Sequence, residues 1–160
     1  MKRAIFPGTF DPFTIGHLDI LEKSIKIFDE VIIAIGKNHD KKTMFTVDKR
    51  KEFIELATSK YQNIKVMIYD GLTVDFCKKT NSNFIVRGIR NVGDFEFEKA
   101  IARTNRALSE IETVFLLTSA KTSYISSSIV RDIIKNNGDC SKLIPNEIIH
   151  MIQDIHLKLS

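Results

Sequence analysis

The sequence lacks the features that mark membrane-spanning and disulfide-bonded proteins. No apolar stretch in its 160 residues approaches the ~20 residues needed to cross a bilayer. The apolar run after Lys2 and Arg3 is broken at Pro7, too early for a secretory signal peptide. The two cysteines, Cys77 and Cys140, have neither metal-ligand spacing nor a redox motif. These absences predict a cytoplasmic protein with reduced thiols that take no part in chemistry, no bound structural metal and no membrane partner.

Two common phosphate-binding fingerprints are also absent. Neither Gly-x-Gly-x-x-Gly nor Gly-x-x-x-x-Gly-Lys-Ser/Thr occurs, which argues against a standard dinucleotide-binding fold and against a P-loop. The sequence contains no internal repeat, linker or low-complexity segment. We therefore predict a single domain over residues 1–160.

The composition is that of a globular protein with a basic surface. Hydrophobic residues make up 43% of the chain and charged residues 28%. The formal net charge of +4 favours anionic ligands, but it does not choose between a nucleotide, a nucleic acid and mere solubility.

Apolar runs with strand character alternate with runs at helical spacing. The pattern predicts strands at 4–6, 31–35, 64–68, 84–86 and 113–117, and helices at 17–28, from 46 to 57, 74–79, 95–108, 126–134 and after Pro145. Such alternation is typical of an α/β protein, here a Rossmann-like, doubly wound, five-stranded parallel sheet with helices on both faces. The loops after strands one, two, four and five then meet at one rim, where ligands bind in these sheets.

The segment from Gly8 to His17 combines a strand end, a polar loop and a helix start. The unpaired N–H groups and the dipole of a helix N-terminus attract anions, and the side chains of Thr9, Thr14 and His17 add donors. The glycines at positions 8 and 16 would let a ligand approach the backbone closely. The segment predicts a polyphosphate site, although each residue alone also fits a plain connection with Thr14 as the helix cap.

Basic and hydroxyl residues follow three other predicted strands. Lys41 lies in the loop after the second strand, where it either reaches a phosphate or stays solvated. Arg87 and Arg90 flank Gly88 at the end of the fourth strand and suit phosphate, with surface solubility as the alternative. The serines 126–128 open a helix, where they cap it and also offer hydroxyl and N–H donors to an anion.

Taken together, these motifs resemble the nucleotidyltransferase superfamily. Thr14-Ile15-Gly16-His17 is similar to its (H/T)-x-G-H signature, and the Phe6–Pro12 string resembles bacterial phosphopantetheine adenylyltransferases in particular. The resemblance covers nearly the whole chain. It includes Lys-Lys-x-Met-Phe from Lys41, Arg-Gly-x-Arg from Arg87, Asp-Phe-Glu-x-Glu from Asp94 and Ile-Ser-Ser-Ser from Ile125.

The resemblance implies transfer of an adenylyl group from ATP to 4′-phosphopantetheine, giving dephospho-coenzyme A and pyrophosphate. It also implies Mg²⁺ as cofactor, a homohexamer and feedback inhibition by coenzyme A. The acceptor phosphate would attack directly in line, so catalysis would rest on positioning and electrostatics, and no side chain would act as nucleophile.

The resemblance also implies roles for individual residues. His17, Lys41 and Arg90 would be catalytic, with His17 stabilising the transition state. Thr9, Lys41, Thr73 and Arg87 would bind the acceptor. ATP would contact Thr9, Phe10, His17, Gly88, Ile89, Arg90, Glu98, Thr122, Ser123, Tyr124, Ile125, Ser126, Ser127 and Ser128.

Three departures from the family pattern bear on the acceptor. Thr73 stands where related enzymes often carry Met or Leu, Gly71 where Asp is common, and Phe97 where Tyr is frequent. Three other functions remain open at this point. They are a nucleotidyltransferase acting on nicotinamide mononucleotide or, with CTP, on an alcohol phosphate, a non-catalytic nucleotide sensor, and an RNA-binding module. The last is disfavoured, because basic residues are not interleaved with aromatic ones, and we expect no nucleic-acid partner.

Overall fold

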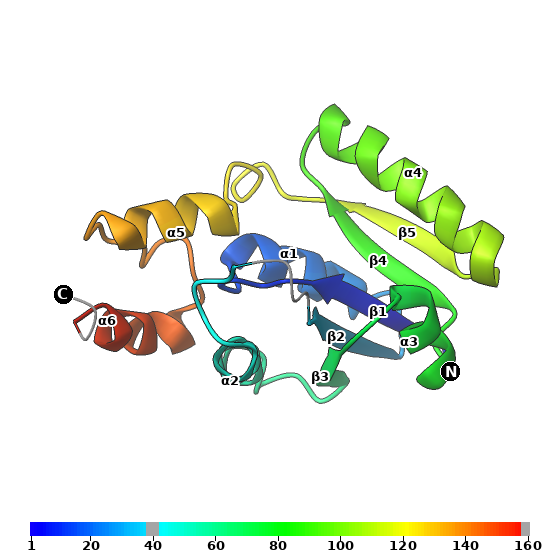
Figure 1. The fold of residues 1–160 in the computed structure, drawn as a ribbon, viewed down its shortest axis with the longest axis horizontal. Coiled ribbons are helices and arrows are strands. Elements are labelled where there is room, and N and C mark those ends of the chain that lie inside the picture. Colours follow the sequence, from blue (N-terminus) through cyan, green and yellow to red (C-terminus); the bar gives the residue numbers. More distant parts are fainter. Residues whose placement is uncertain (38–41, 158–160) are drawn as a thin grey trace.

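The computed structural model describes residues 1–37 and 42–157 of the chain. Five strands and six α-helices alternate along it (Figure 1). The strands are β1 (Arg3–Gly8), β2 (Glu30–Gly36), β3 (Ile64–Tyr69), β4 (Phe84–Ile89) and β5 (Glu112–Leu117). The helices are α1 (Ile15–Ser24), α2 (Val47–Ala57), α3 (Thr73–Lys79), α4 (Val92–Ser109), α5 (Ser127–Lys135) and α6 (Ile149–Leu157), with a 3₁₀ turn, η1 (Asn146–Ile148), before the last.

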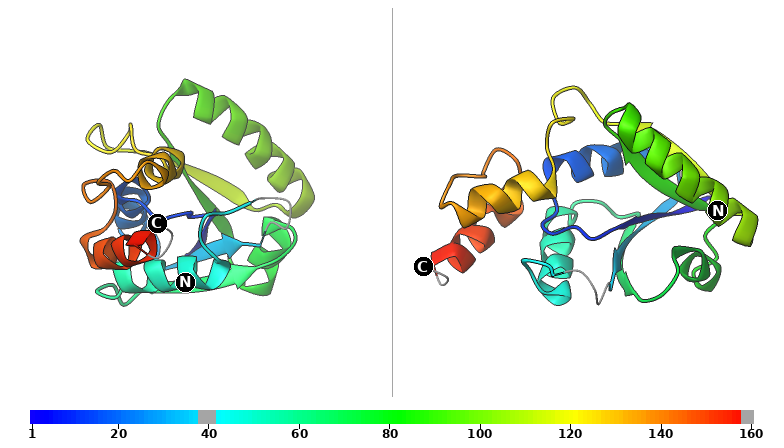
Figure 2. Two further views of the ribbon diagram at one scale, coloured as in Figure 1. Left: turned by 60° about the vertical axis from the view of Figure 1, so that its left-hand side comes forward. Right: turned by 45° about the horizontal axis from the view of Figure 1, so that its top comes forward.

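The strands form one parallel sheet in the order β3-β2-β1-β4-β5. The two faces of the sheet are both covered by helices. Alternate residues of β1 show this, since Ala4 and Phe6 pack in a cluster with α1, α2, α5 and α6, whereas Ile5 packs in a second cluster with α3. The left view of Figure 2 shows α4 on one side of the sheet and α1 on the other. The predicted fold class is therefore confirmed.

The two central strands pair over a short length only. β1 and β4 are in register at two positions, Ala4 with Phe84 and Ile5 with Ile85, whereas β1 pairs with β2 at six positions, from Arg3 to Gly8. The strand order reverses direction between β1 and β4, which is where ligands bind in open parallel sheets. The separation of the strands beyond Ile5 leaves room for such a ligand between the carboxyl halves of β1 and β4.

Several element boundaries differ from the sequence-based expectation. Helix α1 was expected at 17–28, but it begins at Ile15 and ends at Ser24, because Thr14 caps it and the chain turns after Ile25 toward β2. Phe28 is buried outside the helix, in the turn before β2. Strand β4 continues to Ile89, so that Arg87 and Gly88 belong to the strand and not to the loop after it.

The helix after β4 also starts earlier than expected. We expected it at 95–108, but Asn91 caps it through its side chain and α4 runs from Val92 to Ser109.

In the part of the chain that the structure describes, no helix combines the length and the apolar character that a membrane span requires.

Gly88 of β4 lies directly against Ile20 of α1. A Cβ at this position would lie 2.8 Å from Cγ1 of Ile20, whereas a Cβ at Gly16 would make ordinary contacts, the nearest 3.5 Å from Thr14 Oγ1. We expect Gly88→Ala to lower the free energy of unfolding by about 1–3 kcal/mol, because overpacking forces α1 away from the sheet. Urea denaturation measures this as a lower midpoint at unchanged slope. The matched control, Gly16→Ala, should cost nothing, and equal midpoints for the two variants would contradict the packing described here.

Candidate functional site

Two adjoining cavities open at the carboxyl ends of the strands. The first, of about 320 Å³, contains His17 in its wall together with Arg90 and Ser126, and we call it the histidine cavity. The second, of about 550 Å³, includes Tyr69 and Thr73, and we call it the tyrosine cavity. Both cavities share five lining residues, namely Pro7, Gly8, Thr9, Arg87 and Glu98. Two ligands, one in each cavity, would therefore meet at this shared wall.

His17 is the third residue of α1, and its ring is oriented by the helix cap. The backbone N–H of Thr14 donates to Nδ1 of His17 at 3.1 Å, and the N–H of His17 donates to Thr14 Oγ1 at 3.4 Å. Since Nδ1 accepts a hydrogen bond, the neutral ring carries its proton on Nε2. The ring also packs against three phenylalanines, with 5.0 Å between ring centroids for Phe10, 5.5 Å for Phe13 and 6.4 Å for Phe6. His17 is thus held as a neutral N–H donor in the cavity wall.

Burial, together with the charges of Arg87 and Arg90, lowers the pKa of His17 to about 4. In the unfolded chain the pKa is about 6.5, so between these values only the unfolded chain binds the proton. The stability that depends on the neutral ring is present above the unfolded pKa and is lost as the pH falls toward the folded pKa. We expect the wild type to lose about 2 kcal/mol more than His17→Gln between about pH 7 and pH 5. Urea unfolding at the two pH values measures this, and equal losses in both proteins would refute the low pKa.

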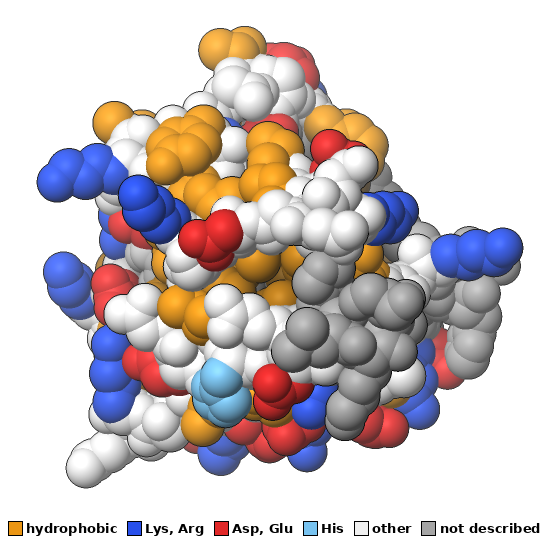
Figure 3. Space-filling model, turned by 90° about the vertical axis from the view of Figure 1, so that its left-hand side faces the viewer, with side chains coloured by type: hydrophobic (Ala, Val, Ile, Leu, Met, Phe, Trp, Pro, Cys, Tyr) orange, Lys and Arg blue, Asp and Glu red, His pale blue; other side chains and the backbone are white. Residues whose placement is uncertain are grey.

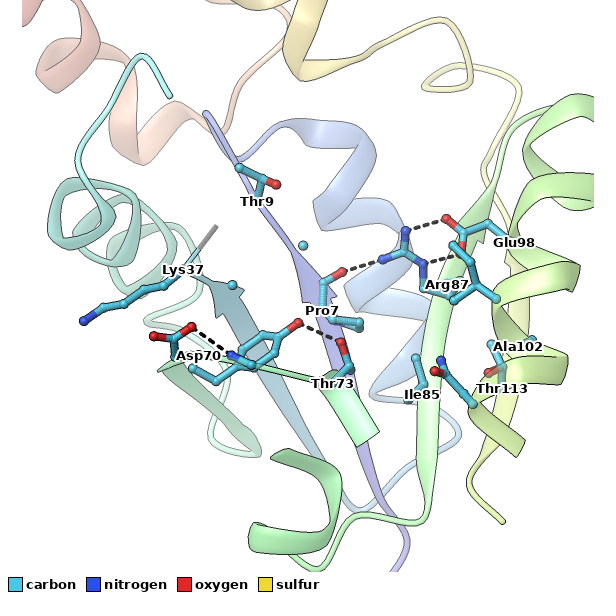
Figure 4. A pocket seen from close by; sticks show the side chains of 16 residues that line it. Pro7, Thr9, Lys37, Asp70, Thr73, Ile85, Arg87, Glu98, Ala102 and Thr113 are labelled. Carbon is cyan, nitrogen blue, oxygen red and sulfur yellow. Dashed lines mark hydrogen bonds and ion pairs between the residues drawn. The ribbon is translucent and has the colours of Figure 1, made fainter. Parts of the chain in front are cut away.

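Two arginines of the β4 segment each pair with a carboxylate of α4. Nε of Arg87 donates to Glu98 Oε2 at 2.8 Å, and Nη1 of Arg87 donates to the carbonyl of Pro7 at 2.6 Å (Figure 4). Arg90 binds Asp94 through Nε at 3.0 Å. Burial opposes the effect, but the hydrogen bonds from Arg90 lower the pKa of Asp94 below its ordinary value. Asp94 and Glu98 thus hold the guanidinium groups of Arg90 and Arg87 in place.

The guanidinium of Arg87 still has donors to spare. Of its five N–H groups, the described bonds to Glu98 and Pro7 use three. The side chain lies in the wall that both cavities share. An anion at the boundary between the cavities can therefore bind Arg87 without breaking the pair with Glu98.

The N-terminus of α5 is docked onto the loop after β1. Ser127 Oγ donates to the carbonyl of Pro12 at 2.8 Å, and Arg131 donates to the carbonyl of Asp11 at 2.7 Å. Ser126 caps the helix by accepting the N–H of Ile129. This contact brings a second helix N-terminus to the histidine cavity, beside that of α1, and the two together favour a polyanion.

A buried scaffold holds the loop after β1 from behind. Both carboxylate oxygens of Asp11 accept backbone N–H groups, from Met44 at 2.8 Å and from Phe45 at 2.9 Å. Arg50 of α2, which is 4% exposed, donates to the carbonyl of Thr9 at 2.6 Å. The phosphate-site prediction assigned Gly8 to ligand approach. Gly8 lines both cavities, and the structure adds a packing reason for a glycine there, because a Cβ would lie 2.7 Å from the ring of Phe10.

Comparisons with known proteins identify the family of this chain. A family model described as cytidylyltransferase-like matches residues 5–133. A phosphopantetheine adenylyltransferase of Flavobacterium psychrophilum is 59% identical over 148 residues, which cover 92% of this chain and 98% of that protein. The chain belongs to the phosphopantetheine adenylyltransferase family. Another relative of that name, from Lachnoclostridium phytofermentans, is 49% identical over 96% of this chain and 95% of its own.

The fold of this family member also matches a solved structure. A bifunctional NMN adenylyltransferase/ADP ribose pyrophosphatase from Francisella tularensis superposes with a TM-score of 0.76 at 16% identity. The match covers 96% of this chain and 49% of that one, so the chain spans about half of that protein's length. At this identity the likeness shows the shared fold alone.

Most residues that the family resemblance singles out converge on the two cavities. The histidine cavity is lined by Thr9, Phe10, His17, Arg87, Gly88, Arg90, Glu98, Ile125, Ser126 and Ser127. The tyrosine cavity is lined by Thr73 and, again, by Thr9 and Arg87. Lys41 lies outside the described residues, and its role stays a prediction.

Five of the expected ATP contacts do not line the histidine cavity, namely Ile89, Thr122, Ser123, Tyr124 and Ser128. Ile89 is 4% exposed at the end of β4, and Tyr124 is 65% exposed. The hydroxyl of Thr122 binds inside the protein instead, to the carbonyl of Ser119 at 3.2 Å. Their roles as nucleotide contacts stay predictions.

The structure adds cavity residues that sequence reasoning did not select. Asp94, Thr118 and Arg131 line the histidine cavity, and Lys37, Tyr69 and Asn105 line the tyrosine cavity. Lys37, Asp94 and Arg131 lie in polar segments that follow predicted strands, but none of them was assigned a role. The phenol of Tyr69 shares a hydrogen bond of 2.8 Å with the Thr73 hydroxyl, which gives this departure from the family pattern a partner (Figure 4). Gly71 has a φ of +82°, which favours glycine at that departure.

Proposed function

We propose that this protein transfers the adenylyl group of ATP to 4′-phosphopantetheine, giving dephospho-coenzyme A and pyrophosphate. Membership of the family supports this, and so does one observation above all. The cavity with His17 and the cavity with Thr73 meet at Arg87. A reaction that joins two phosphorylated molecules needs such a junction between two anion-binding chambers.

The adenine nucleotide would occupy the histidine cavity. Its phosphates would lie between the N-termini of α1 and α5, with Arg90 and the Nε2–H of His17 as further donors. The acceptor would occupy the tyrosine cavity, with its phosphate at Arg87 and near the Thr9 hydroxyl. This arrangement would place an acceptor oxygen in line with the α-phosphorus at the shared wall.

The protein would then catalyse by positioning and by neutralising charge. The acceptor phosphate oxygen is itself the nucleophile, so its attack on the α-phosphorus displaces pyrophosphate without a covalent enzyme intermediate. His17 would donate Nε2–H to an oxygen that gains charge in the transition state. Because the ring is neutral, this donation needs no proton transfer, and the rate should not depend on a histidine titrating near neutral pH.

Magnesium enters the proposal with the nucleotide. In the described part of the chain, no cluster of three His, Cys, Asp or Glu residues could hold a metal ion. The three acids that line the histidine cavity, Asp11, Asp94 and Glu98, are each already paired with an arginine. The donor set therefore does not form a site dedicated to Mg²⁺, which commonly binds through substrate phosphates.

Assembly and inhibition extend the proposal. The homohexamer that the family resemblance implies is supported by apolar side chains on α4 and at the end of β5, where Phe97 is 68% and Leu117 74% exposed. Figure 3 shows that Lys and Arg lie mainly at the margins of the face that holds α5 and α6.

Coenzyme A combines an adenosine part with a pantetheine arm, so it would fill both cavities and compete with the substrates. The cytoplasmic location also stays a prediction.

Pyrophosphate release tests the proposed reaction. We expect pyrophosphate to be released from ATP when 4′-phosphopantetheine is the acceptor. We expect no release from ATP with nicotinamide mononucleotide, and none from CTP with an alcohol phosphate. ATP binding without turnover of any acceptor would instead favour a nucleotide sensor. Binding to RNA with a steep salt dependence would revive the third alternative.

A further inference from the structure

The segment between β5 and α5 is held by a side chain that belongs to neither. Asp19 lies on α1, two residues after His17, and its carboxylate contacts residues 119 and 122. Oδ2 accepts the backbone N–H of Ser119 at 2.8 Å, and Oδ1 accepts the Ser119 hydroxyl at 2.6 Å. The Thr122 hydroxyl shares its one proton between Oδ2, at 3.4 Å, and the carbonyl of Ser119, at 3.2 Å. One carboxylate thus binds three donors of a segment that is a hundred residues away in sequence.

Lys23 completes this arrangement from the next turn of α1. Its Nζ donates to Asp19 Oδ2 at 2.9 Å, to the carbonyl of Leu117 at 2.6 Å and to Ser119 Oγ at 3.0 Å. Although partial burial opposes it, the hydrogen bonds from Ser119 and Lys23 lower the pKa of Asp19. The carboxylate therefore stays ionised, which strengthens each bond that it accepts. We call Asp19 and Lys23 the α1 brace.

The braced segment leads directly into the histidine cavity. The N–H of Thr122 donates to the carbonyl of Ser119 at 2.9 Å, and the N–H of Ile125 donates to the carbonyl of Thr122 at 3.1 Å. These two bonds fix the position of Ile125 relative to Ser119. Ile125 lines the cavity together with Ser126 and Ser127. Thr118, the residue before Ser119, donates its N–H to the carbonyl of Ile89 at 3.0 Å. The segment is thus tied to β4 on one side and to α1 on the other.

We propose that Asp19 is a positioning residue that sets the affinity for the adenine nucleotide without touching it. It holds residues 119–125 against α1, so that the N-terminus of α5 faces His17 across the histidine cavity. The Thr122 hydroxyl serves the same brace, which accounts for its absence from the cavity wall. The inference rests on the proposed function only in naming the nucleotide.

Calorimetric titration of ATP, without acceptor, tests the brace directly. Asp19→Ala removes the three bonds from residues 119 and 122 together with the bond from Lys23, and we expect its Kd for ATP to rise about 10–50-fold, as for the loss of hydrogen bonds to a charged group. Asp19→Asn keeps an acceptor for the Ser119 N–H and should lie between the alanine variant and the wild type. The KM for 4′-phosphopantetheine at saturating ATP should stay at the wild-type value in both variants.

A matched control lies on the same helix. Glu22 of α1 accepts a hydrogen bond of 2.5 Å from the hydroxyl of Tyr61, away from both cavities. Glu22→Ala should leave the Kd for ATP unchanged, even where its thermal midpoint falls as far as that of Asp19→Ala. Unchanged ATP affinity in Asp19→Ala, or a parallel rise in the acceptor KM, would overturn the proposal. Weaker ATP binding in Asp19→Ala would support the brace even if wild-type protein released no pyrophosphate, an outcome that would refute the proposed reaction alone.

Discussion

His17→Ala is expected to lower kcat about 10²–10³-fold while changing the KM for ATP little. The structure gives the reason, because Nδ1 of His17 is occupied by the Thr14 N–H and only Nε2–H is left to donate into the histidine cavity. A donor aimed at charge that develops during the reaction contributes to the rate and adds little to ground-state binding. Steady-state kinetics with both substrates measure the split.

Two further variants sharpen this test. Glutamine can place an amide N–H where Nε2 lies, whereas asparagine reaches only to the position of Nδ1, so His17→Gln should recover part of the rate and His17→Asn none. His150→Ala, an exposed histidine of α6, is the neutral control. A rise in KM for ATP at unchanged kcat would show that His17 binds the nucleotide and does not stabilise the transition state.

Arg87→Met is expected to raise the KM for 4′-phosphopantetheine about 100-fold, since truncating one partner of a charged pair at a binding site costs about 2–5 kcal/mol. Arg87 is the cation at the wall shared by the two cavities, and it has N–H groups to spare for the acceptor phosphate. The KM for ATP should change less. Initial rates at saturating ATP give the acceptor KM.

The chain offers a matched control for Arg87 at the opposite end of the sheet. Arg3 on β1 likewise binds a glutamate, Glu30, and a backbone carbonyl, that of Thr80. Arg3→Met should lower stability and leave both KM values unchanged. Because Arg87→Met leaves Glu98 unpaired, the double variant Arg87→Met/Glu98→Gln is needed too. Restored acceptor KM in the double variant would assign the defect to the stranded carboxylate and contradict a phosphate contact.

The sequence was sufficient to predict the architecture and the centre of the site. The mostly β-branched run Val31–Ile35 indicates a strand buried on both faces, and the strand–loop–helix pattern at Gly8–His17 predicts an anion site at the sheet edge. The convergence of His17, Arg90 and Ser126 on one cavity confirms that the three loops meet. Parallel strands with helical crossovers leave little freedom in where their carboxyl ends lie.

What could not be predicted depends on contacts between distant segments. Nothing local distinguishes Asp19 from any other acid on a helix, because its partners lie near residue 120. Nothing local distinguishes Arg50 from its basic neighbours on α2, Lys49 and Lys51, yet it is buried against the carbonyl of Thr9. Glu98 was selected through family resemblance alone, and its partner, Arg87, became evident only when α4 was placed over β4. Side chains that support a site carry no signature of their own in the sequence.

The brief pairing of β1 with β4 has a consequence for how the substrates influence each other. Beyond Ile5 and Ile85, the halves of the sheet are bridged at this level by the bond from Arg87 to the Pro7 carbonyl. A phosphate that binds this guanidinium and shifts it affects both cavities, since Pro7 and Arg87 line each of them. Thermodynamic linkage then requires that, if one substrate changes the affinity for the other by some factor, the second substrate changes the affinity for the first by the same factor.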